Sequence, residues 1–159
     1  FPIEIKRKAE KVFKHCLKRK IKLAFAESCT GGLLSSLITS YPNSSKIFTS
    51  GFVTYSNLSK QNMLGVKSKT LMKYGAVSKE VATEMVNGAW KKNKANIVLS
   101  ITGIAGPTGQ TKGKKIGLVY IGIKSKKGIE INEFSFKGNR EKIRLASVEK
   151  AIDLISSVI

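Results

Sequence analysis

The sequence predicts an α/β fold, a three-layer α/β/α sandwich built on a mixed sheet. Helical and strand-like segments alternate along most of the chain, which is typical of domains with helices on both faces of a sheet. Two strand-like segments follow each other late in the chain across a tight turn, so part of the sheet should be antiparallel. The length of 159 residues suits one domain with a single core.

The N-terminal region predicts a helix followed by a strand. Residues 5–17 carry apolar side chains at helical spacing with lysines between them. We therefore expect residues 1–20 to form an amphipathic helix that packs on a single domain spanning residues 1–159. The segment "IKLAFAE" at residues 21–27 is bounded by charge and predicts a strand.

The next helix and strand are marked by their ends and their composition. The segment "CTGGLLSSLITSY" predicts a helix that begins at Ser28 or Thr30 and ends near Pro42. Residues 46–56 are rich in β-branched and aromatic side chains, which predicts a strand with a bulge at Gly51. Two short helical segments, "NLSKQNMLGV" and "SKTLMKYG", follow it.

The second half of the chain predicts one long helix, three strands and a closing helix. Ser78 is the expected N-cap of a helix that runs to about Lys92. Residues 96–102 predict a buried strand, and residues 115–125 and 128–138 predict an antiparallel pair joined at "KKG". The closing helix, "NREKIRLASVEKAIDLISSVI", is expected to turn five side chains inward. These are Ile143, Ala146, Ala151, Leu154 and Ile155.

The net charge of +19 suggests a partner that carries negative charge. Only four of the 29 basic residues are arginine, however, and the lysines are spread along the chain, so nucleic acid is an open but not a favoured partner. A phosphorylated small substrate would also be attracted. No apolar run approaches the roughly 20 residues that a membrane span needs. The N-terminus is too charged for a signal peptide, so we expect a cytoplasmic protein with no membrane partner.

Cysteine, histidine and aspartate are too few to indicate a metal site. Cys16 and Cys29 make no disulfide framework and lack metal-binding spacing. A zinc site needs three or four convergent ligands, and the single histidine, His15, lies in the basic N-terminal helix. We therefore expect no protein-held catalytic metal and no cofactor.

Three segments with polar and glycine residues each follow a predicted strand, and they define the candidate site. They are "ESCTGG", "TYSNLSK" and "TGIAGPTGQT". In open α/β sheets, ligands bind in the crevice beyond the carboxyl ends of the strands. The third segment lacks the Gly-Lys-Ser/Thr ending of a phosphate-binding P-loop, yet its backbone donors would suit a phosphate or a ribose. A flexible connection is the alternative.

Ser28 has two interpretations. It could cap the following helix, because a serine hydroxyl accepts a backbone N–H there. It could instead be a nucleophile beside free helix N–H groups, which would hold an oxyanion or a phosphate. Gly31 and Gly32 would let a ligand approach the backbone closely. Cys29 is a rival nucleophile, since a thiol at a helix N-terminus has a lowered pKa, although a small buried cysteine is the commoner outcome.

A serine nucleophile needs a base, and lysine is the remaining type. A Ser–His–Asp triad would require His15 and Asp153, which both read as helix-surface residues. A lysine acts as a base only when neutral, after burial or neighbouring cations lower its pKa. Lys60 is the best placed, five residues after Tyr55, although a solvated lysine is the ordinary case. Tyr55 could orient Lys60 or relay a proton, or simply pack at the strand end.

The predicted substrate-binding residues surround the three segments. Glu27 could pair with Lys60 or with a cation on the substrate, or be solvated. Arg140 and Arg144 lie one helical turn apart and could clamp a phosphate or pair with carboxylates. The full set is Glu27, Thr30, Gly31, Gly32, Asn57, Thr102, Gly103, Ala105, Gly106, Arg140 and Arg144.

Six blocks in order carry a resemblance to a known family. They are "AESCTGGLL", "GFVTYSNLSKQNMLGV", "YGAVSKEVATEM", "SITGIAGPTGQT", "GLVYIGI" and "FKGNREKIR". From about Leu23 to the end, the chain resembles the C-terminal domain of the CinA family, whose standalone members are nicotinamide-nucleotide amidases. The resemblance covers nearly the whole chain, and standing alone the chain looks like those members.

The resemblance implies a function and a set of catalytic residues. It implies hydrolysis of the carboxamide of nicotinamide mononucleotide (NMN) to nicotinate mononucleotide and ammonia, in pyridine nucleotide recycling. It implies Ser/Lys chemistry with Ser28 and Lys60, assisted by Tyr55, in a three-layer α/β/α domain that forms homo-oligomers, with a dimer favoured. One departure is Gln110, where the family usually has glycine, which could alter the fit of the substrate. The alternative function is a nucleic-acid-binding or competence-linked regulatory module without turnover; a nucleotide-binding domain that has lost turnover is a third.

Overall fold

Five strands form one mixed sheet in the computed structural model, which describes residues 1–159. Their order across the sheet is β2 (Phe48–Val53), β1 (Leu23–Glu27), β3 (Ile97–Gly103), β4 (Leu118–Ser125) and β5 (Gly128–Ser135). β1 is parallel to both β2 and β3, whereas β3 and β4, and then β4 and β5, are antiparallel. The predicted mixed sheet and its late hairpin are therefore confirmed.

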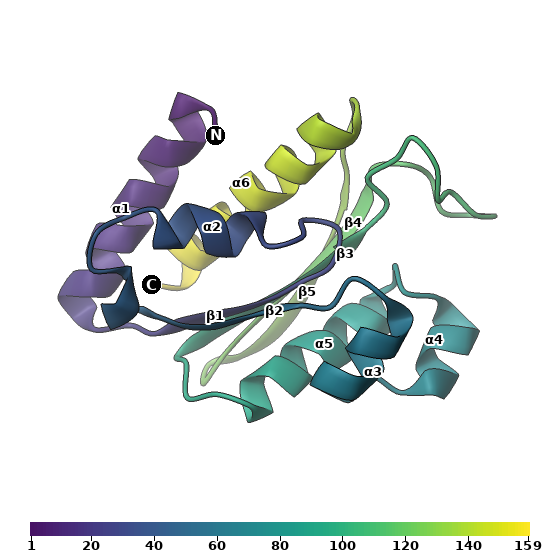
Figure 1. The fold of residues 1–159 in the computed structure, drawn as a ribbon, viewed down its shortest axis with the longest axis horizontal. Helices are drawn as coiled ribbons and strands as arrows, with labels where there is room; N and C mark the ends of the chain where they lie inside the picture. Colours follow the sequence, from purple (N-terminus) through teal and green to yellow (C-terminus); the bar gives the residue numbers. More distant parts are fainter.

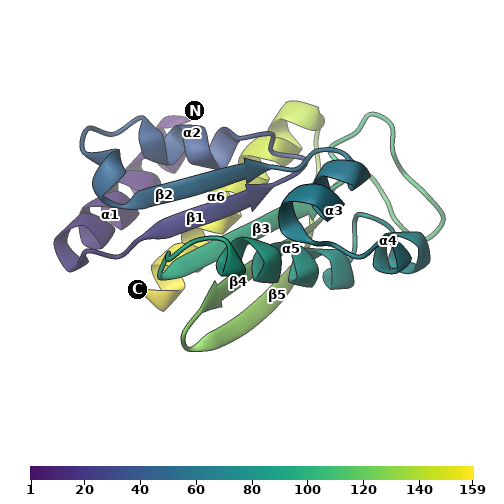
Figure 2. The same cartoon turned by 60° about the horizontal axis from the view of Figure 1, so that its bottom comes forward.

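Helices cover both faces of this sheet, as Figures 1 and 2 show. One face carries α1 (Ile3–Arg19), α2 (Leu33–Thr39) and α6 (Arg140–Val158), and the other carries α3 (Asn57–Leu64), α4 (Ser68–Tyr74) and α5 (Lys79–Lys91). A short 3-10 turn, η1 (Ser44–Lys46), precedes β2. This arrangement confirms the three-layer α/β/α sandwich. No helix combines the length and the apolar character needed to cross a membrane.

The core lies in two parts, one on each face of the sheet. The larger part joins β1, β3 and β4 to α1, α2 and α6, and the smaller part joins the opposite side chains of β1 and β3 to α3, α4 and α5. All five residues of β1 are buried because helices cover both of its faces. Burial of the large apolar side chains among them, Leu23 and Phe25, contributes about 1.5–3 kcal/mol each.

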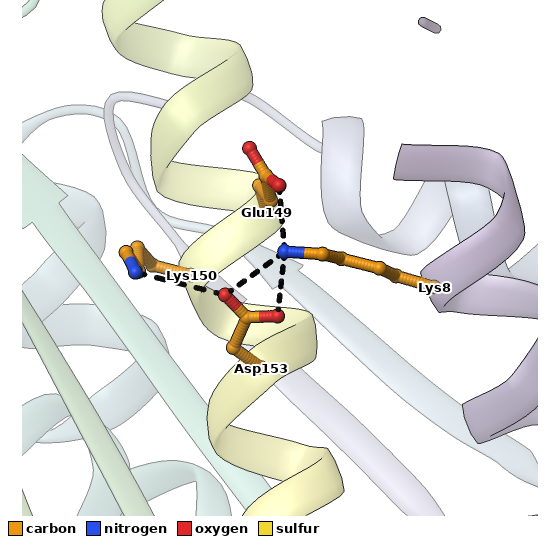
Figure 3. A network of polar contacts seen from close by, with 4 residues as sticks. All are labelled: Lys8, Glu149, Lys150 and Asp153. Atoms are coloured by element: carbon orange, nitrogen blue, oxygen red, sulfur yellow. Dashed lines mark hydrogen bonds and ion pairs between the residues drawn. The ribbon is translucent and has the colours of Figure 1, made fainter. Parts of the chain in front are cut away.

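The N-terminal helix α1 packs on α6 through apolar side chains, and a small ionic network borders this contact (Figure 3). Lys8 Nζ lies 2.7 Å from Glu149 and 3.0 Å from Asp153, and Lys150 lies 3.7 Å from Asp153. Two hydrogen bonds that Lys8 donates raise its pKa: the bond to Glu149 has the larger effect, and the bond to Asp153 the next largest. These groups are about one third exposed, so the network adds little to stability. Asp153 is thus a surface partner of α1.

Two helices begin directly after the residues that cap them, and a third begins later than the sequence predicted. Ser78 Oγ accepts the N–H of Val81 at 3.2 Å, as predicted, and Asn139 caps α6 in the same way. The helix predicted to begin at Ser28 or Thr30 begins instead at Leu33. The intervening residues form a turn, because Gly31 and Gly32 adopt left-handed backbone angles, with φ of +56° and +96°. We call residues 28–32 the serine turn.

Two details of β2 and α6 also differ from the sequence-based expectation. The register of β2 shifts between its partners Leu23 and Ala24, so the irregularity lies before Gly51, which pairs regularly with Phe25. In α6, Ala146 and Leu154 are only half-buried, while Val148 and Ile152 are fully buried. The buried stripe of α6 is therefore rotated from the predicted one and follows Ile143, Ser147, Ala151 and Ile155, spaced by four residues.

Candidate active site

Three loops meet at the carboxyl ends of β1, β2 and β3, as the sequence predicted. β1 leads into the serine turn, β2 into the start of α3, and β3 into the glycine-rich loop at residues 104–117. A cavity of about 240 Å³ lies between them, with walls from all three loops, from the segment before α5 and from Arg140 at the start of α6. Sites of this kind form where parallel strands release the chain.

Ser28 and Lys60 are in direct contact at the floor of this cavity. Lys60 Nζ lies 3.0 Å from Ser28 Oγ, although the two residues are 32 positions apart in sequence. Ser28 is held by its N–H, which donates to the carbonyl of Ile101 on β3 at 2.9 Å. Lys60 lies one turn into α3, whose N-cap is Ser56, and its side chain is 1% exposed. Ser28 is therefore not a helix cap, because α2 begins five residues later.

The surroundings of Lys60 favour its neutral form. Its Nζ donates to the carbonyls of Thr54 at 2.8 Å and Tyr55 at 3.2 Å, and no carboxylate lies within salt-bridge distance of it. Burial lowers the pKa of Lys60 to about 8. After loss of one proton, the amine can still donate to both carbonyls, and its lone pair can then accept the Ser28 O–H. The geometry thus suits a base that removes a proton from Ser28.

Glu27 does not reach the cavity, so the structure does not support its predicted role at the substrate. Its buried carboxylate accepts the N–H of Leu34 at 2.9 Å and the N–H and hydroxyl of Ser35 at 3.0 and 2.7 Å. These bonds satisfy the first orphan donors of α2 and place a negative charge at its N-terminus. Glu27 therefore fixes α2 against β1, and it forms no hydrogen bond or ion pair with Lys60.

Four more predicted binding residues lie outside the cavity lining. Gly31 and Gly32 have the left-handed angles that the serine turn requires, and a Cβ on them would lie 3.4 Å from Arg144 Nη2 and 3.5 Å from Val53 Cγ2, respectively. Thr30 is completely buried and its hydroxyl has no partner. Asn57, the first residue of α3, is exposed. The glycines therefore serve the backbone conformation of this turn.

Tyr55 contributes to the site in a different way from the one predicted. Its carbonyl accepts a hydrogen bond from Lys60, but its hydroxyl accepts one from Arg140 Nη2 at 2.7 Å. The side chain is 58% exposed and lies on the cavity wall. The phenol is thus bound to Arg140 and does not orient Lys60 in this structure.

The two arginines of α6, predicted as a pair, occupy different places. Arg140 lines the cavity, donates to the carbonyl of Gly106 at 2.9 Å, and holds Tyr55. Arg144 does not line it: its Nε donates to the carbonyl of Cys29 and its Nη2 to that of Thr30, each at 3.0 Å. Of the two arginines only Arg140 lines this cavity, so the structure does not bring them together as the predicted clamp.

The glycine-rich loop lines the cavity with backbone groups. Thr102, Gly103, Ala105 and Gly106 all lie in the wall, as predicted. The hydroxyl of Thr102 is bound to the carbonyl of Ala76 at 2.8 Å and so fixes the wall. The N–H groups of Ala105 and Gly106 donate to no protein acceptor, although both residues are buried. Free backbone N–H groups of this kind suit an anionic ligand.

Cys29 is a poor rival to Ser28. Burial raises the pKa of its thiol to about 12, so the thiolate that attacks a carbonyl would be scarce at neutral pH. The lowered pKa expected for a helix N-terminus is absent because the serine turn separates Cys29 from α2. No three His, Cys, Asp or Glu side chains lie close enough together to hold a metal ion.

Some contributors to the site escaped the sequence analysis. The carbonyls of Thr54 and Tyr55 hold Lys60, but every residue has a carbonyl, so no sequence signal marks them. Ala76 and Val77 complete the cavity wall, and only their place in the block "YGAVSKEVATEM" pointed to them. Gly88 lets α5 approach α3, because a Cβ there would lie 1.9 Å from the carbonyl oxygen of Leu64.

Comparisons with known proteins identify what the chain resembles. The family model described as "CinA C-terminal domain" matches residues 5–159. The "CinA-like protein" of Endomicrobium trichonymphae is 50% identical over 139 residues, which are 87% of this chain and 32% of that protein. The chain spans about a third of the length of the curated relatives it matches.

Solved structures agree over the whole fold. The competence/damage inducible protein CihA from Agrobacterium tumefaciens matches with a TM-score of 0.95 and 37% identity, over 99% of this chain and 96% of that one. The competence damage-inducible protein A from Klebsiella pneumoniae matches with a TM-score of 0.93 and 28% identity, over 97% and 96% of the two chains.

Proposed function

The chain belongs to the CinA C-terminal domain family, and on that basis we propose that it hydrolyses the carboxamide of NMN to nicotinate mononucleotide and ammonia. The observation that carries the proposal is the 3.0 Å contact between Lys60 Nζ and Ser28 Oγ in a buried site. A lysine in that position has no structural ion pair to make, and its pKa is lowered to about 8. That combination is typical of a serine activated by a base.

In the first half of the reaction, Ser28 attacks the carboxamide carbon. Neutral Lys60 takes the Ser28 proton as the Oγ–carbon bond forms, and the carbonyl oxygen becomes an oxyanion. The N–H groups of Cys29 and Thr30, which have no protein acceptor, are the nearest backbone donors to Ser28 in sequence. The carbon–nitrogen bond then breaks, and the ammonium of Lys60 gives its proton to the leaving nitrogen, so that ammonia departs.

In the second half of the reaction, water hydrolyses the acyl-enzyme. Lys60, neutral again, takes a proton from the water as its oxygen bonds to the acyl carbon. The Ser28 Oγ–carbon bond breaks, and Ser28 recovers a proton from Lys60. The products are nicotinate mononucleotide and the free enzyme, and one water is consumed for each ammonia released. One amine thus serves as base and acid in turn.

The 5′-phosphate of the substrate is assigned to Arg140 and the glycine-rich loop. The Arg140 guanidinium lines the cavity and has donors left after its bonds to Gly106 and Tyr55. The unpaired N–H groups of Ala105 and Gly106 lie in the same wall. Arg144 is excluded because it lies outside that wall and binds two carbonyls.

The decisive experiment is an ammonia assay with purified protein and NMN. The proposal expects stoichiometric ammonia and nicotinate mononucleotide, with heat-denatured protein as control. Salt-dependent retention of DNA without ammonia release would favour the nucleic-acid-binding alternative. Calorimetric binding of NMN without hydrolysis would indicate a domain that has lost turnover. Each of these two outcomes contradicts the proposal.

The rate should depend on pH through Lys60. Because its pKa is about 8 and its neutral form is the base, kcat/KM should rise about tenfold per pH unit below 8 and level off above it. The measurement is initial ammonia release at low NMN concentration from about pH 6 to about pH 9.5, a range that brackets the midpoint. A flat profile, or a rate that falls as pH rises, would contradict the role of Lys60 as base.

Arg140→Ala should weaken substrate binding more than it slows the chemistry. Loss of a charge-assisted bond to phosphate predicts a KM for NMN raised by about 10- to 100-fold, with a smaller change in kcat. Nicotinamide riboside, which lacks the phosphate, provides the control: its kcat/KM should be nearly the same in the variant and the wild type. Equal losses for both substrates would mean that Arg140 does not bind the phosphate.

A further inference from the structure

We propose that Arg144 is a positioning residue that holds Cys29 and Thr30 of the serine turn by their carbonyls, so that the unpaired N–H of Cys29, which lines the cavity, faces the developing oxyanion. The inference rests on the proposed amide hydrolysis. Arg144 reaches the serine turn from α6, 115 positions away, and donates from Nε to the Cys29 carbonyl and from Nη2 to the Thr30 carbonyl. Two donors of one planar guanidinium thus hold two consecutive carbonyls at 3.0 Å each.

The planar geometry of the peptide bond shows where the N–H groups of the serine turn point when Arg144 holds its carbonyls. A peptide group is planar and trans, so its N–H points opposite to its C=O. The C=O of the Cys29–Thr30 peptide points at Arg144, and the Thr30 N–H therefore points away from the guanidinium. The next N–H, that of Gly31, closes the turn by donating to the Ser28 carbonyl at 2.9 Å.

Three N–H groups of the serine turn have no acceptor, those of Cys29, Thr30 and Gly32, and the first two are unusual for their burial. Cys29 is 6% exposed and Thr30 is 0% exposed, yet neither N–H donates to any protein acceptor. Buried backbone N–H groups are nearly always paired. Of the two residues, Cys29 lines the cavity and Thr30 does not, so the Cys29 N–H, directly after the candidate nucleophile, is the donor suited to a ligand atom that carries negative charge, as the oxyanion does.

The first turn of α2 cannot supply these donors. Its N–H groups at Leu34 and Ser35 are bound by the carboxylate of Glu27. The serine turn therefore supplies the unpaired backbone N–H groups nearest to Ser28 in sequence, and it contains Gly31 and Gly32, which tolerate several conformations. Arg144 restricts it: the guanidinium lies against Gly31, where a Cβ would be 3.4 Å from Nη2.

The positive charge of Arg144 also favours an oxyanion at the serine turn. Burial is the main influence on the Cys29 thiol and raises its pKa to about 12, while Arg144 acts in the opposite direction by favouring the thiolate. The field of the guanidinium therefore reaches the serine turn and favours negative charge there. An oxyanion formed on the same turn would be favoured for the same reason.

Arg140 and Arg144 should consequently have opposite kinetic signatures. Arg144→Ala should lower kcat by about 10²- to 10³-fold, as loss of an oxyanion donor does, with KM within about threefold of the wild type. Its pH midpoint near 8 should not move, because Lys60 is untouched. Arg144→Lys should remain impaired, since one ammonium cannot hold two carbonyls as a planar fork does. Lys142→Ala, exposed on the same helix, should retain the wild-type rate.

The experiment measures kcat, KM and the pH profile for these variants with NMN, and repeats Arg144→Ala with added guanidinium chloride at a concentration that leaves the protein folded. Partial recovery of kcat by guanidinium is expected for a positioning role. If Arg144→Ala does not fold, the kcat and KM of Arg144→Lys test the inference in its place, and thermal unfolding shows whether that variant is folded. Unchanged kcat, or a raised KM like that of Arg140→Ala, overturns the inference. Absence of ammonia release by the wild type overturns the proposed function itself, which keeps the two failures apart.

Discussion

Lys60→Ala should lower kcat/KM for NMN by about 10⁴-fold while the protein remains folded. The variant removes the only titratable side chain bonded to Ser28, and with it the base for the attack and the acid for the departure of ammonia. Neither histidine nor aspartate is available to replace it, because His15 lies in α1 and Asp153 is engaged with Lys8 and Lys150. The measurement is ammonia release over hours at high enzyme concentration.

Two further substitutions separate the chemistry of Lys60 from its structural contribution. Lys60→Met keeps most of the chain length without an amine, and Lys60→Arg keeps the charge but cannot become neutral in the working pH range. Both should be as inactive as Lys60→Ala, whereas Lys67→Ala, an exposed lysine just before α4, should be fully active. Thermal unfolding should show that Lys60→Met is folded, because it removes a desolvated ammonium from the interior. Activity above roughly a tenth of the wild-type value in any folded Lys60 variant would contradict the dyad.

The place of the site could be predicted because it depends on topology. Parallel strands release their loops at one edge of a sheet, so the segments after β1, β2 and β3 had to approach one another. The spacing of Lys60 within its segment also carried information. Lys60 and Leu64 lie four positions apart and both face inward from α3, so a helix there places the amine toward the sheet.

The roles of individual polar residues were harder to predict, because their partners are far away in sequence. Arg140 and Arg144 share one side of α6, but one turn moves a side chain about 6 Å along a helix axis. Arg140 therefore lines the cavity, while Arg144, four positions later, bonds to the carbonyls of Cys29 and Thr30. Glu27 was hard to interpret for another reason: its partners Leu34 and Ser35 are near in sequence, but which N–H groups it binds depends on where α2 begins.

The serine turn explains why the helix boundary was misplaced. Serine, threonine and glycine after a strand are typical of a capped helix, and the same residues suit a turn with left-handed glycines. Contacts from outside the turn decide between a capped helix and a turn. Glu27 binds the start of α2, and Arg144 binds the Cys29 carbonyl. Both contacts are tertiary, so local propensity could not reveal them.

Ser28→Ala is the most severe test, and we expect it to lower kcat by about 10⁵-fold or more. The hydroxyl is the atom that bonds to the substrate carbon, and no other nucleophile lies beside Lys60, since Cys29 is held as a neutral thiol by its raised pKa. Binding should survive, because the phosphate is assigned to Arg140 and the glycine-rich loop. Calorimetry should therefore give a Kd for NMN within about threefold of the wild-type value under conditions where turnover is slow.

The same variant distinguishes a covalent route from direct attack by water. If Lys60 activated water directly, Ser28→Ala would leave room for a water molecule beside the amine, and much of the rate would remain. If Ser28 forms an acyl-enzyme, hydroxylamine added to the wild type should compete with water and yield the hydroxamate of nicotinate mononucleotide, whereas Ser28→Ala should yield none. If the wild type gives no hydroxamate and Ser28→Ala is active, the nucleophile is a water molecule activated by Lys60, not Ser28. The 3.0 Å contact between Lys60 Nζ and Ser28 Oγ would then serve to position that water.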